Sequence, residues 1–130
     1  MRYLLDTHVW LWMLAAPERI RKDIWPTLLD RDQELLLSAA SSWEIAVKYR
    51  LQRLQLPAPP EEFVPHYLRE SGVAGLPIQH RHALQVAELP DHHRDPFDRL
   101  LVAQAQTEEL AIITADPLIF RYQVEVLPAV

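Results

Sequence analysis

Residues 2–11 read Arg2-Tyr3-Leu4-Leu5-Asp6-Thr7-His8-Val9-Trp10-Leu11. The short apolar run that ends at Leu5 is typical of a buried β-strand, and Asp6-Thr7 then offers a helix cap. The residues after this cap stay largely apolar as far as Leu14 and favour a helix. The stretch therefore predicts a strand followed directly by a helix, with Asp6 at the junction.

The same alternation of strand and helix continues along the chain. Four further strands are predicted at residues 34–38, 73–77, 110–114 and 124–127. Helices are predicted at residues 9–14, 17–30, 39–51, 61–71 and 80–89, and a sixth begins at Pro96 after an Asp95 cap. Pro26 is a point at which the helix over residues 17–30 can kink. This order predicts an α/β fold, a three-layer α/β/α sandwich with a mostly parallel central sheet.

The composition limits the kinds of site that the chain can build. Its length of 130 residues fits a single domain over residues 1–130. The absence of cysteine excludes disulfides, thiolate zinc sites and cysteine nucleophiles. With only two glycines, Gly72 and Gly75, the chain has no glycine-rich phosphate loop of the Rossmann or P-loop type. The apolar start resembles a signal peptide, but Asp6 and His8 interrupt it, so we expect a soluble, cytoplasmic protein without a membrane segment.

Four acidic residues stand where a predicted strand ends or inside the helix that follows it. They are Asp6, Glu44, Asp98 and Asp116. Because the carboxyl ends of parallel strands share one edge of a sheet, we expect these side chains to converge on one site, where they could hold a hard divalent cation. The net charge of −5 argues against a protein that binds a polyanion, but this objection weakens if four of the negative charges are cation ligands.

Each acidic residue also has a purely structural interpretation. Asp6 could be only a helix cap, Asp98 could complement the dipole of its helix three residues after the Asp95 cap, and Asp116 could belong to an ordinary turn. Glu44 could pair with Lys48 four residues later. The joint pattern favours a shared site, since independent caps have no reason to share one edge with a mid-helix glutamate.

Four segments of the chain together resemble the PIN-domain ribonucleases, and the closest likeness is to the VapC toxins of bacterial toxin–antitoxin pairs. The segments are Tyr3-Leu4-Leu5-Asp6-Thr7-His8, Ser38-Ala39-Ala40-Ser41-Ser42-Trp43-Glu44-Ile45-Ala46, His93-Arg94-Asp95-Pro96-Phe97-Asp98-Arg99-Leu100-Leu101 and Ile112-Ile113-Thr114-Ala115-Asp116. They follow the order of the family over nearly the whole chain. An Asp-Thr-His opening alone would be a weak signal, whereas the combination is far more specific.

The resemblance implies a catalytic and metal-binding quartet of Asp6, Glu44, Asp98 and Asp116, with Asp95 as its neighbour. It further implies an Mg²⁺- or Mn²⁺-dependent endoribonuclease that leaves 5′-phosphate and 3′-hydroxyl ends. The family's hydroxyl after the first aspartate falls on Thr7, and Thr114 could orient a ligand or a water. A VapB-type antitoxin and a homodimer are the partners that the resemblance implies, beside the RNA substrate.

An RNA substrate requires positive charge near the acidic site. The candidates in the motif segments are Arg94, Arg99, Lys48, Arg50 and Arg53. Solvated surface is the commoner role for such residues, and Arg99 could instead pair with Asp95 or Glu109. The tryptophans Trp10, Trp12, Trp25 and Trp43 could stack RNA bases, although burial in the core or in an interface fits their apolar neighbours better.

Two other functions fit parts of the sequence. Asp91-His92-His93, with His80, His82 and Asp95, spells the signature of another phosphoesterase family and could form a transition-metal site. That family needs further aspartate motifs and a second domain, so the simpler interpretation is a polar loop whose histidines face water. The second alternative is a catalytically inactive PIN-like module that binds RNA or protein, against which the intact acidic quartet argues.

Overall fold

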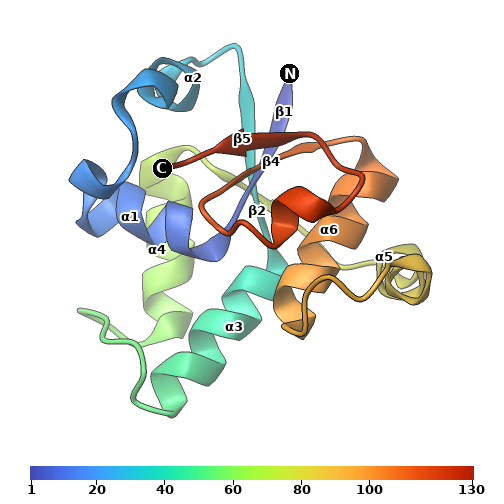
Figure 1. Cartoon of the computed structure of the whole chain (residues 1–130). Helices are drawn as coiled ribbons and strands as arrows, with labels where there is room; N and C mark the ends of the chain where they lie inside the picture. Colours follow the sequence, from blue (N-terminus) through green and yellow to red (C-terminus); the bar gives the residue numbers. More distant parts are fainter.

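The computed structural model describes residues 1–130, and its centre is a five-stranded sheet in the order β3-β2-β1-β4-β5. The strands are β1 (Arg2–Leu5), β2 (Glu34–Ser38), β3 (Ala74–Leu76), β4 (Ala111–Thr114) and β5 (Val126–Pro128). All four pairings are parallel, so the carboxyl ends of the five strands share one edge, toward which β1 and β2 run downward in Figure 1. The order of strands reverses at β1 and β4, and such a switch point is where open α/β sheets bind ligands.

Successive residues of each strand face opposite sides of the sheet and build two cores. Leu5 and Ile113 belong to one apolar cluster, whereas Leu4 and Ile112 belong to the other, and all four side chains are fully buried. Burial on both faces explains why the strands are apolar runs without a polar alternation. The predicted α/β/α sandwich is confirmed.

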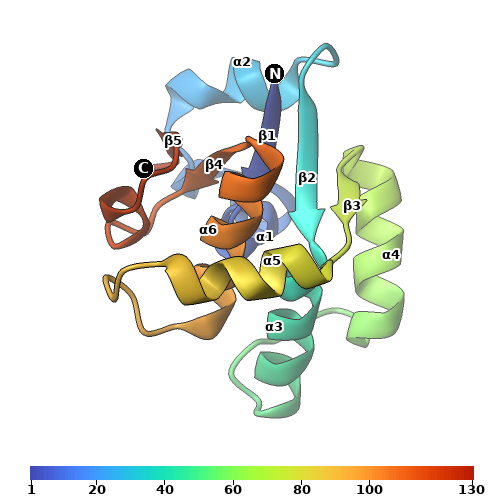
Figure 2. The same ribbon diagram turned by 90° about the vertical axis from the view of Figure 1, so that its right-hand side faces the viewer.

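Helices cover both faces of this sheet. The helices are α1 (Thr7–Ala15), α2 (Trp25–Leu29), α3 (Ala39–Arg50), α4 (Pro60–Ser71), α5 (His80–Gln85) and α6 (Pro96–Glu108). Trp10 of α1 and Phe63 of α4 pack edge to face in the cluster that contains Leu5, and Leu101 of α6 lies in the opposite cluster. Helix α3 leaves the carboxyl end of β2 and projects below the sheet, and α5 lies beside α6 (Figures 1 and 2).

The predicted helix over residues 17–30 is wrong. This segment forms two short 3₁₀ turns, η1 (Pro17–Arg19) and η2 (Lys22–Ile24), before α2 begins. The helix is interrupted because Ile20 is extended, with φ −92° and ψ 133°, and the Arg21 N–H donates to the Ala129 carbonyl at 2.8 Å. Pro26 lies in the first turn of α2, where a missing N–H costs nothing, so it starts a helix and does not kink one.

The remaining elements differ from their predicted ranges only near their ends. The helix over residues 80–89 stops at Gln85 and continues as the 3₁₀ turn η3 (Val86–Glu88), and a further turn, η4 (Ile119–Arg121), precedes β5. No helix combines the length and the apolar character that crossing a membrane requires.

Candidate metal centre

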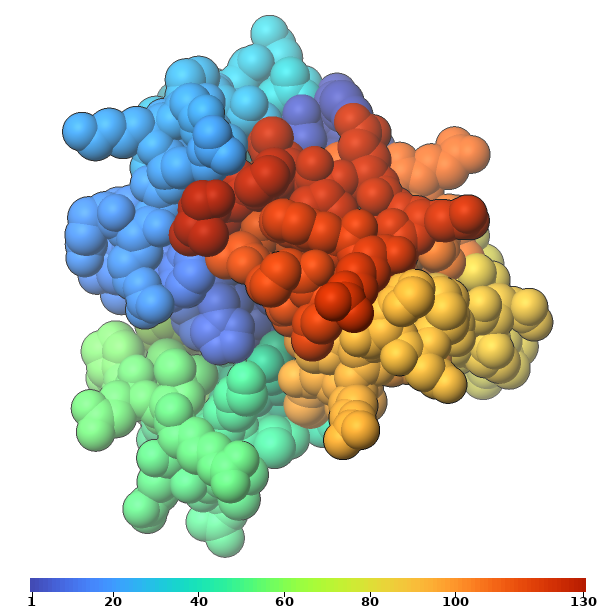
Figure 3. All heavy atoms as spheres, viewed as in Figure 1, coloured from blue at the N-terminus to red at the C-terminus, as the bar shows by residue number.

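The four acidic residues come from four segments that meet at the carboxyl edge of the sheet. Asp6 directly follows β1, Asp116 lies two residues after β4, Glu44 is in the second turn of α3, and Asp98 is in the first turn of α6. In Figure 3 the blue start of α1, the blue-green α3 and the orange start of α6 approach one another on the lower half of the face shown. The fold thus gathers residues that are up to 110 positions apart, from Asp6 to Asp116.

Crowding of these carboxylates changes their acidity. Burial raises the pKa of Asp98 to about 8, and the negative charges of Asp6, Asp95, Glu44 and Asp116 add to this rise. Burial also raises the pKa of Asp6, with smaller contributions from Glu44 and Asp116, although a hydrogen bond from Thr114 opposes it. Glu44 therefore lies close enough to both aspartates for its charge to act on them. Carboxylates gathered in this way repel one another when they are ionised, and a bound cation would relieve that repulsion.

Asp6 is 5% exposed and does not use its side chain as a helix cap, although it occupies the cap position of α1. Its Oδ2 instead accepts a hydrogen bond of 2.6 Å from the Thr114 hydroxyl at the end of β4. The Thr7 hydroxyl donates to Ser41 Oγ at 2.8 Å and so ties the start of α1 to the start of α3. The predicted orienting role of Thr114 is supported by its contact with Asp6, whereas Thr7 bonds another hydroxyl.

Glu44 is buried to 2% exposure and only half of its carboxylate is paired. The predicted i,i+4 ion pair exists, since Lys48 Nζ lies 2.5 Å from Glu44 Oε2. The other oxygen, Oε1, is buried without any hydrogen-bond partner. An unpaired buried carboxylate oxygen is costly, and coordination of a cation would remove that cost.

His93 completes the acidic site and was not predicted as part of it. Its Nε2 lies 2.7 Å from Asp116 Oδ2 and 3.1 Å from Asp98 Oδ2, and the ligand atoms of the three residues all lie within 4.8 Å of one another. The backbone N–H of Asp95 donates to His93 Nδ1 at 3.1 Å. Because Nδ1 accepts this hydrogen bond, the ring proton of a neutral His93 is on Nε2, which donates toward the two carboxylates.

The backbone of His93 is fixed as firmly as its ring. Its N–H donates to the Tyr122 hydroxyl at 2.8 Å. Arg99 donates to the carbonyls of Pro90 at 2.9 Å and Val86 at 3.2 Å, with a longer contact of 3.5 Å to the His93 carbonyl. The predicted pairing of Arg99 with Asp95 or Glu109 is wrong, because its guanidinium caps the carbonyls of the 86–93 segment. Arg99 therefore supports the segment that carries His93.

The histidine-rich alternative does not form a second metal site. His82 is fully buried, accepts a hydrogen bond from the Gln79 N–H at 2.9 Å and lies 2.8 Å from Glu108 Oε1, so it joins α5 to α6. His80 and His92 are exposed. The interpretation that these histidines face water is right for His92 but wrong for His82 and His93.

The remaining candidates divide between structural and exposed positions. Asp95 caps α6, since its Oδ1 accepts hydrogen bonds from the N–H groups of Phe97 and Asp98 at 2.8 and 3.4 Å. Trp10 is buried as expected, whereas Trp43 is 56% exposed and packs edge to face on Phe97 at 4.7 Å. Burial thus accounts for some of the tryptophans but not for Trp43.

Comparison with known proteins agrees with this geometry. A family model described as the PIN domain matches residues 3–124 of the chain. The chain belongs to the PIN domain family. The sequence of this PIN domain is also 45% identical, over 53 residues, to Ribonuclease VapC16 of Mycobacterium tuberculosis, and the match covers 41% of the chain and 38% of that relative. The chain thus matches well under two thirds of the length of this curated relative.

Two solved structures illustrate the fold that this chain shares with known proteins. VapBC2 from Rickettsia felis, bound to a DNA fragment from its promoter, is similar with a TM-score of 0.74 at 14% identity, over 100% of both chains. FitAcB from Neisseria gonorrhoeae is similar with a TM-score of 0.65 at 23% identity, over 96% of both chains. At these identities the likeness shows the fold, and the resemblance to PIN domains that the sequence predicts is confirmed.

Proposed function

We propose that this PIN domain is an endoribonuclease that depends on Mg²⁺ or Mn²⁺ and acts as a VapC-type toxin. The observation that carries the proposal is the buried, unpaired Oε1 of Glu44 beside three further carboxylates. The match to a relative named as a ribonuclease supports the RNA substrate. No observation favours the inactive RNA-binding or protein-interaction alternative.

The donor set of the site fits a hard divalent cation. Asp6, Glu44, Asp98 and Asp116 supply oxygen atoms only, and Mg²⁺ binds to one or two protein carboxylates together with water and substrate phosphate. His93 faces Asp98 and Asp116 with a protonated nitrogen, so it is a hydrogen-bond donor to these carboxylates and no metal ligand.

A bound divalent cation would supply charge for the scissile phosphate and activate water for hydrolysis of the phosphodiester bond. The residues of the chain orient the reacting groups. Thr114 fixes one oxygen of Asp6, and Lys48 fixes one oxygen of Glu44, so that the second oxygen of each carboxylate remains for coordination. Burial at the switch point between β1 and β4 keeps these carboxylates in a medium where their charges act strongly.

The proposed partner is a VapB-type antitoxin protein, and the proposed assembly is a homodimer in the cytoplasm. VapBC and FitAcB are the complexes whose folds this chain shares, which supports a protein antitoxin. Trp43 and Leu51 are exposed apolar side chains on or just after α3, and burial of such groups would favour association with a protein surface.

Removal of divalent metal is the direct test of the proposed function. Purified protein with an excess of Mn²⁺ or Mg²⁺ is expected to cleave a long single-stranded RNA, and exhaustive chelation is expected to stop cleavage because the carboxylates alone cannot bind the phosphate. End-labelled products analysed on a gel measure both the rate and the 5′-phosphate ends. Cleavage that survives chelation would reject the metal-dependent mechanism.

His93 is expected to act as a positioning residue. Its Nε2–H holds Asp98 and Asp116 in fixed orientations, and loss of such an outer contact typically costs about 10- to 100-fold in metal affinity or activity. We therefore expect His93→Leu to lower kcat by about that factor. His93→Gln keeps an N–H donor of similar reach and is expected to recover most of the loss.

The two variants also separate a donor from a ligand. Electron paramagnetic resonance of the Mn²⁺-loaded protein should show no coupling to an imidazole nitrogen if His93 only donates. Observation of that coupling in the wild type and its loss in His93→Gln would instead make His93 a metal ligand. His92→Gln is the matched control, since His92 is exposed and contacts no acidic residue.

A further inference from the structure

A cavity of about 250 Å³ adjoins the acidic site between α1 and α3. Its polar lining consists of Thr7 and Glu44, which belong to the acidic site, together with His8, Lys48 and Arg53. One end of the cavity is thus shared with the proposed metal centre, and its remaining polar groups are all basic. We call this space the α1–α3 cavity.

The end of α3 brings two of the basic residues together. Lys48 lies one helical turn after Glu44, and α3 ends at Arg50. Gln52 then adopts a left-handed conformation with φ 59°, and the Arg53 N–H donates to the Lys48 carbonyl at 2.9 Å. The chain therefore turns back after α3, and Arg53 lies beside Lys48. His8 reaches the same cavity from the first turn of α1.

The basic side chains that line the cavity differ in whether they already have an ion-pair partner. Lys48 forms an ion pair with Glu44, with its Nζ 2.5 Å from Oε2. Arg53 is exposed, and its guanidinium takes part in none of the ion pairs or side-chain hydrogen bonds of the protein. A guanidinium group without a partner is suited to binding phosphate, because two of its N–H groups can donate parallel hydrogen bonds to two phosphate oxygens.

We propose that the α1–α3 cavity binds the phosphate next to the scissile one in a single-stranded RNA, with Arg53 as its main ligand and His8 and Lys48 beside it. The inference rests on the proposed function, because it extends the RNA path away from the metal centre. Although the net charge of −5 argues against binding of a polyanion, positive side chains line this cavity next to the acidic site and could bind RNA phosphate.

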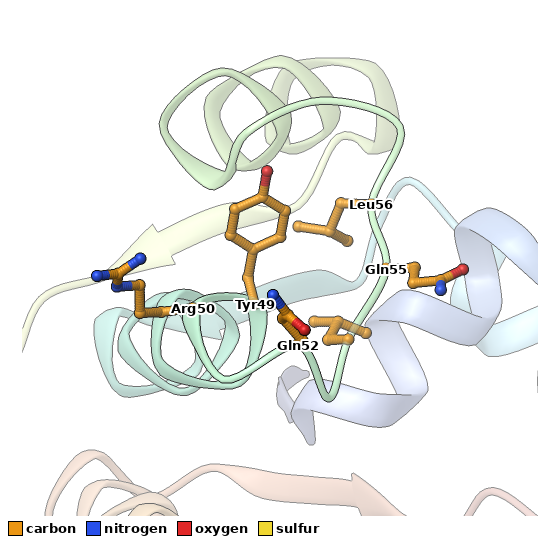
Figure 4. A pocket seen from close by; sticks show the side chains of 6 residues that line it. Tyr49, Arg50, Gln52, Gln55 and Leu56 are labelled. Carbon is orange, nitrogen blue, oxygen red and sulfur yellow. The ribbon is translucent and has the colours of Figure 1, made fainter.

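The other basic residues predicted for RNA contacts lie differently. Arg99 is bound to the carbonyls of the 86–93 segment. Arg50 borders another cavity of about 630 Å³, together with Tyr49 and Leu56, and that cavity shares Leu54 with the α1–α3 cavity but no residue with the acidic site. In Figure 4 the Arg50 side chain extends away from Gln55 and Leu56. Arg50 is therefore a matched control for Arg53, with the same charge and a similar position after Glu44.

The test compares the RNA cleavage kinetics of Arg53→Gln, Arg53→Lys and Arg50→Gln with those of the wild type, in Mn²⁺ and at several salt concentrations. For Arg53→Gln we expect KM to rise about tenfold with kcat within about twofold, because one charged hydrogen-bonding group to the substrate is lost. The slope of log(kcat/KM) against log[salt] should become shallower by about 0.7, the value for one phosphate contact on a single strand. Arg53→Lys should recover part of the loss, and Arg50→Gln should match the wild type.

An Arg53→Gln variant with the KM and the salt slope of the wild type would overturn the subsite, while wild-type cleavage would leave the proposed function intact. A wild type that cleaves no RNA in Mn²⁺ would instead overturn the proposed function. If Arg53→Gln kept its RNA kinetics but lost binding to a poly-glutamate peptide, the cavity would belong to a protein carboxylate, and the RNA subsite would again be wrong.

Discussion

Replacement of Asp98 by asparagine is expected to lower RNA cleavage by about 10³-fold, equivalent to about 4 kcal/mol of transition-state stabilisation, and at the same time to stabilise the metal-free protein. The activity would fall because the substitution replaces the carboxylate of a proposed metal ligand by a neutral amide beside Asp6, Glu44 and Asp116. The stability rises because the folded protein no longer has to hold a carboxyl group whose pKa is raised to about 8. Single-turnover cleavage rates and urea unfolding at pH 8 measure the two effects.

Asp91→Asn is the matched control for this experiment. Asp91 lies in the connection before α6, its side chain is fully exposed, and Arg99 Nη1 is 3.7 Å away. The same change of charge there should leave both the cleavage rate and the free energy of unfolding unaltered. A fully active Asp98→Asn protein would remove Asp98 from the catalytic group.

The metal-free protein is expected to lose stability as the pH rises from 4 to 8. The pKa of Asp98 is near 3.8 in the unfolded chain and about 8 in the folded protein, so between these values the folded state binds more protons. The free energy of unfolding then decreases with pH, by at most about 1.4 kcal/mol per pH unit for one such group. The raised pKa of Asp6 acts in the same direction. Urea unfolding in the presence of a chelator, at intervals of pH, measures this slope.

Divalent metal should reverse this trend. Because the ligands must be ionised, metal binds more tightly at higher pH, and a concentration of 100 times Kd would add about 2.7 kcal/mol. The metal-dependent gain in stability should therefore be larger at pH 8 than at pH 5. Asp98→Asn should flatten the pH profile of the metal-free protein. A metal-free wild type that becomes more stable from pH 5 to 8 would contradict the crowded, uncompensated site.

The strands could be predicted from the local pattern of apolar residues, because these strands are buried on both faces of the sheet. The runs that end at Leu5 and Ser38 predicted β1 and β2 with the correct bounds, and the Asp95-Pro96 pair predicted the start of α6. The prediction of one helix over residues 17–30 was wrong because the backbone of this segment is held by a hydrogen bond to Ala129, which is far away in the sequence. A pattern of local spacing carries no information on such a contact.

The candidate site could be predicted only in its acidic part. Asp6 and Asp116 follow strands, and the topology of a parallel sheet places all such positions at one edge. His93 lies in a polar connection without periodicity, and its neighbours Asp91 and His92 suggested a different metal site. Its contact with Asp116, which is 23 residues away, depends on how Arg99 and Tyr122 fold that connection back over the sheet.

The amino-acid pattern alone was enough to predict that these carboxylates share an edge, because local apolar spacing carries the alternation of strands and helices, and a parallel sheet places the carboxyl ends of its strands together. The order of the strands in the sheet, and which carboxylate oxygens already have hydrogen-bond partners, could be known only from the folded domain. Thr114 takes one oxygen of Asp6, Lys48 takes one of Glu44, and Arg53 is left without a partner. These assignments depend on distances of a few ångströms between segments far apart in the chain, and such distances are fixed by the packing of the whole domain.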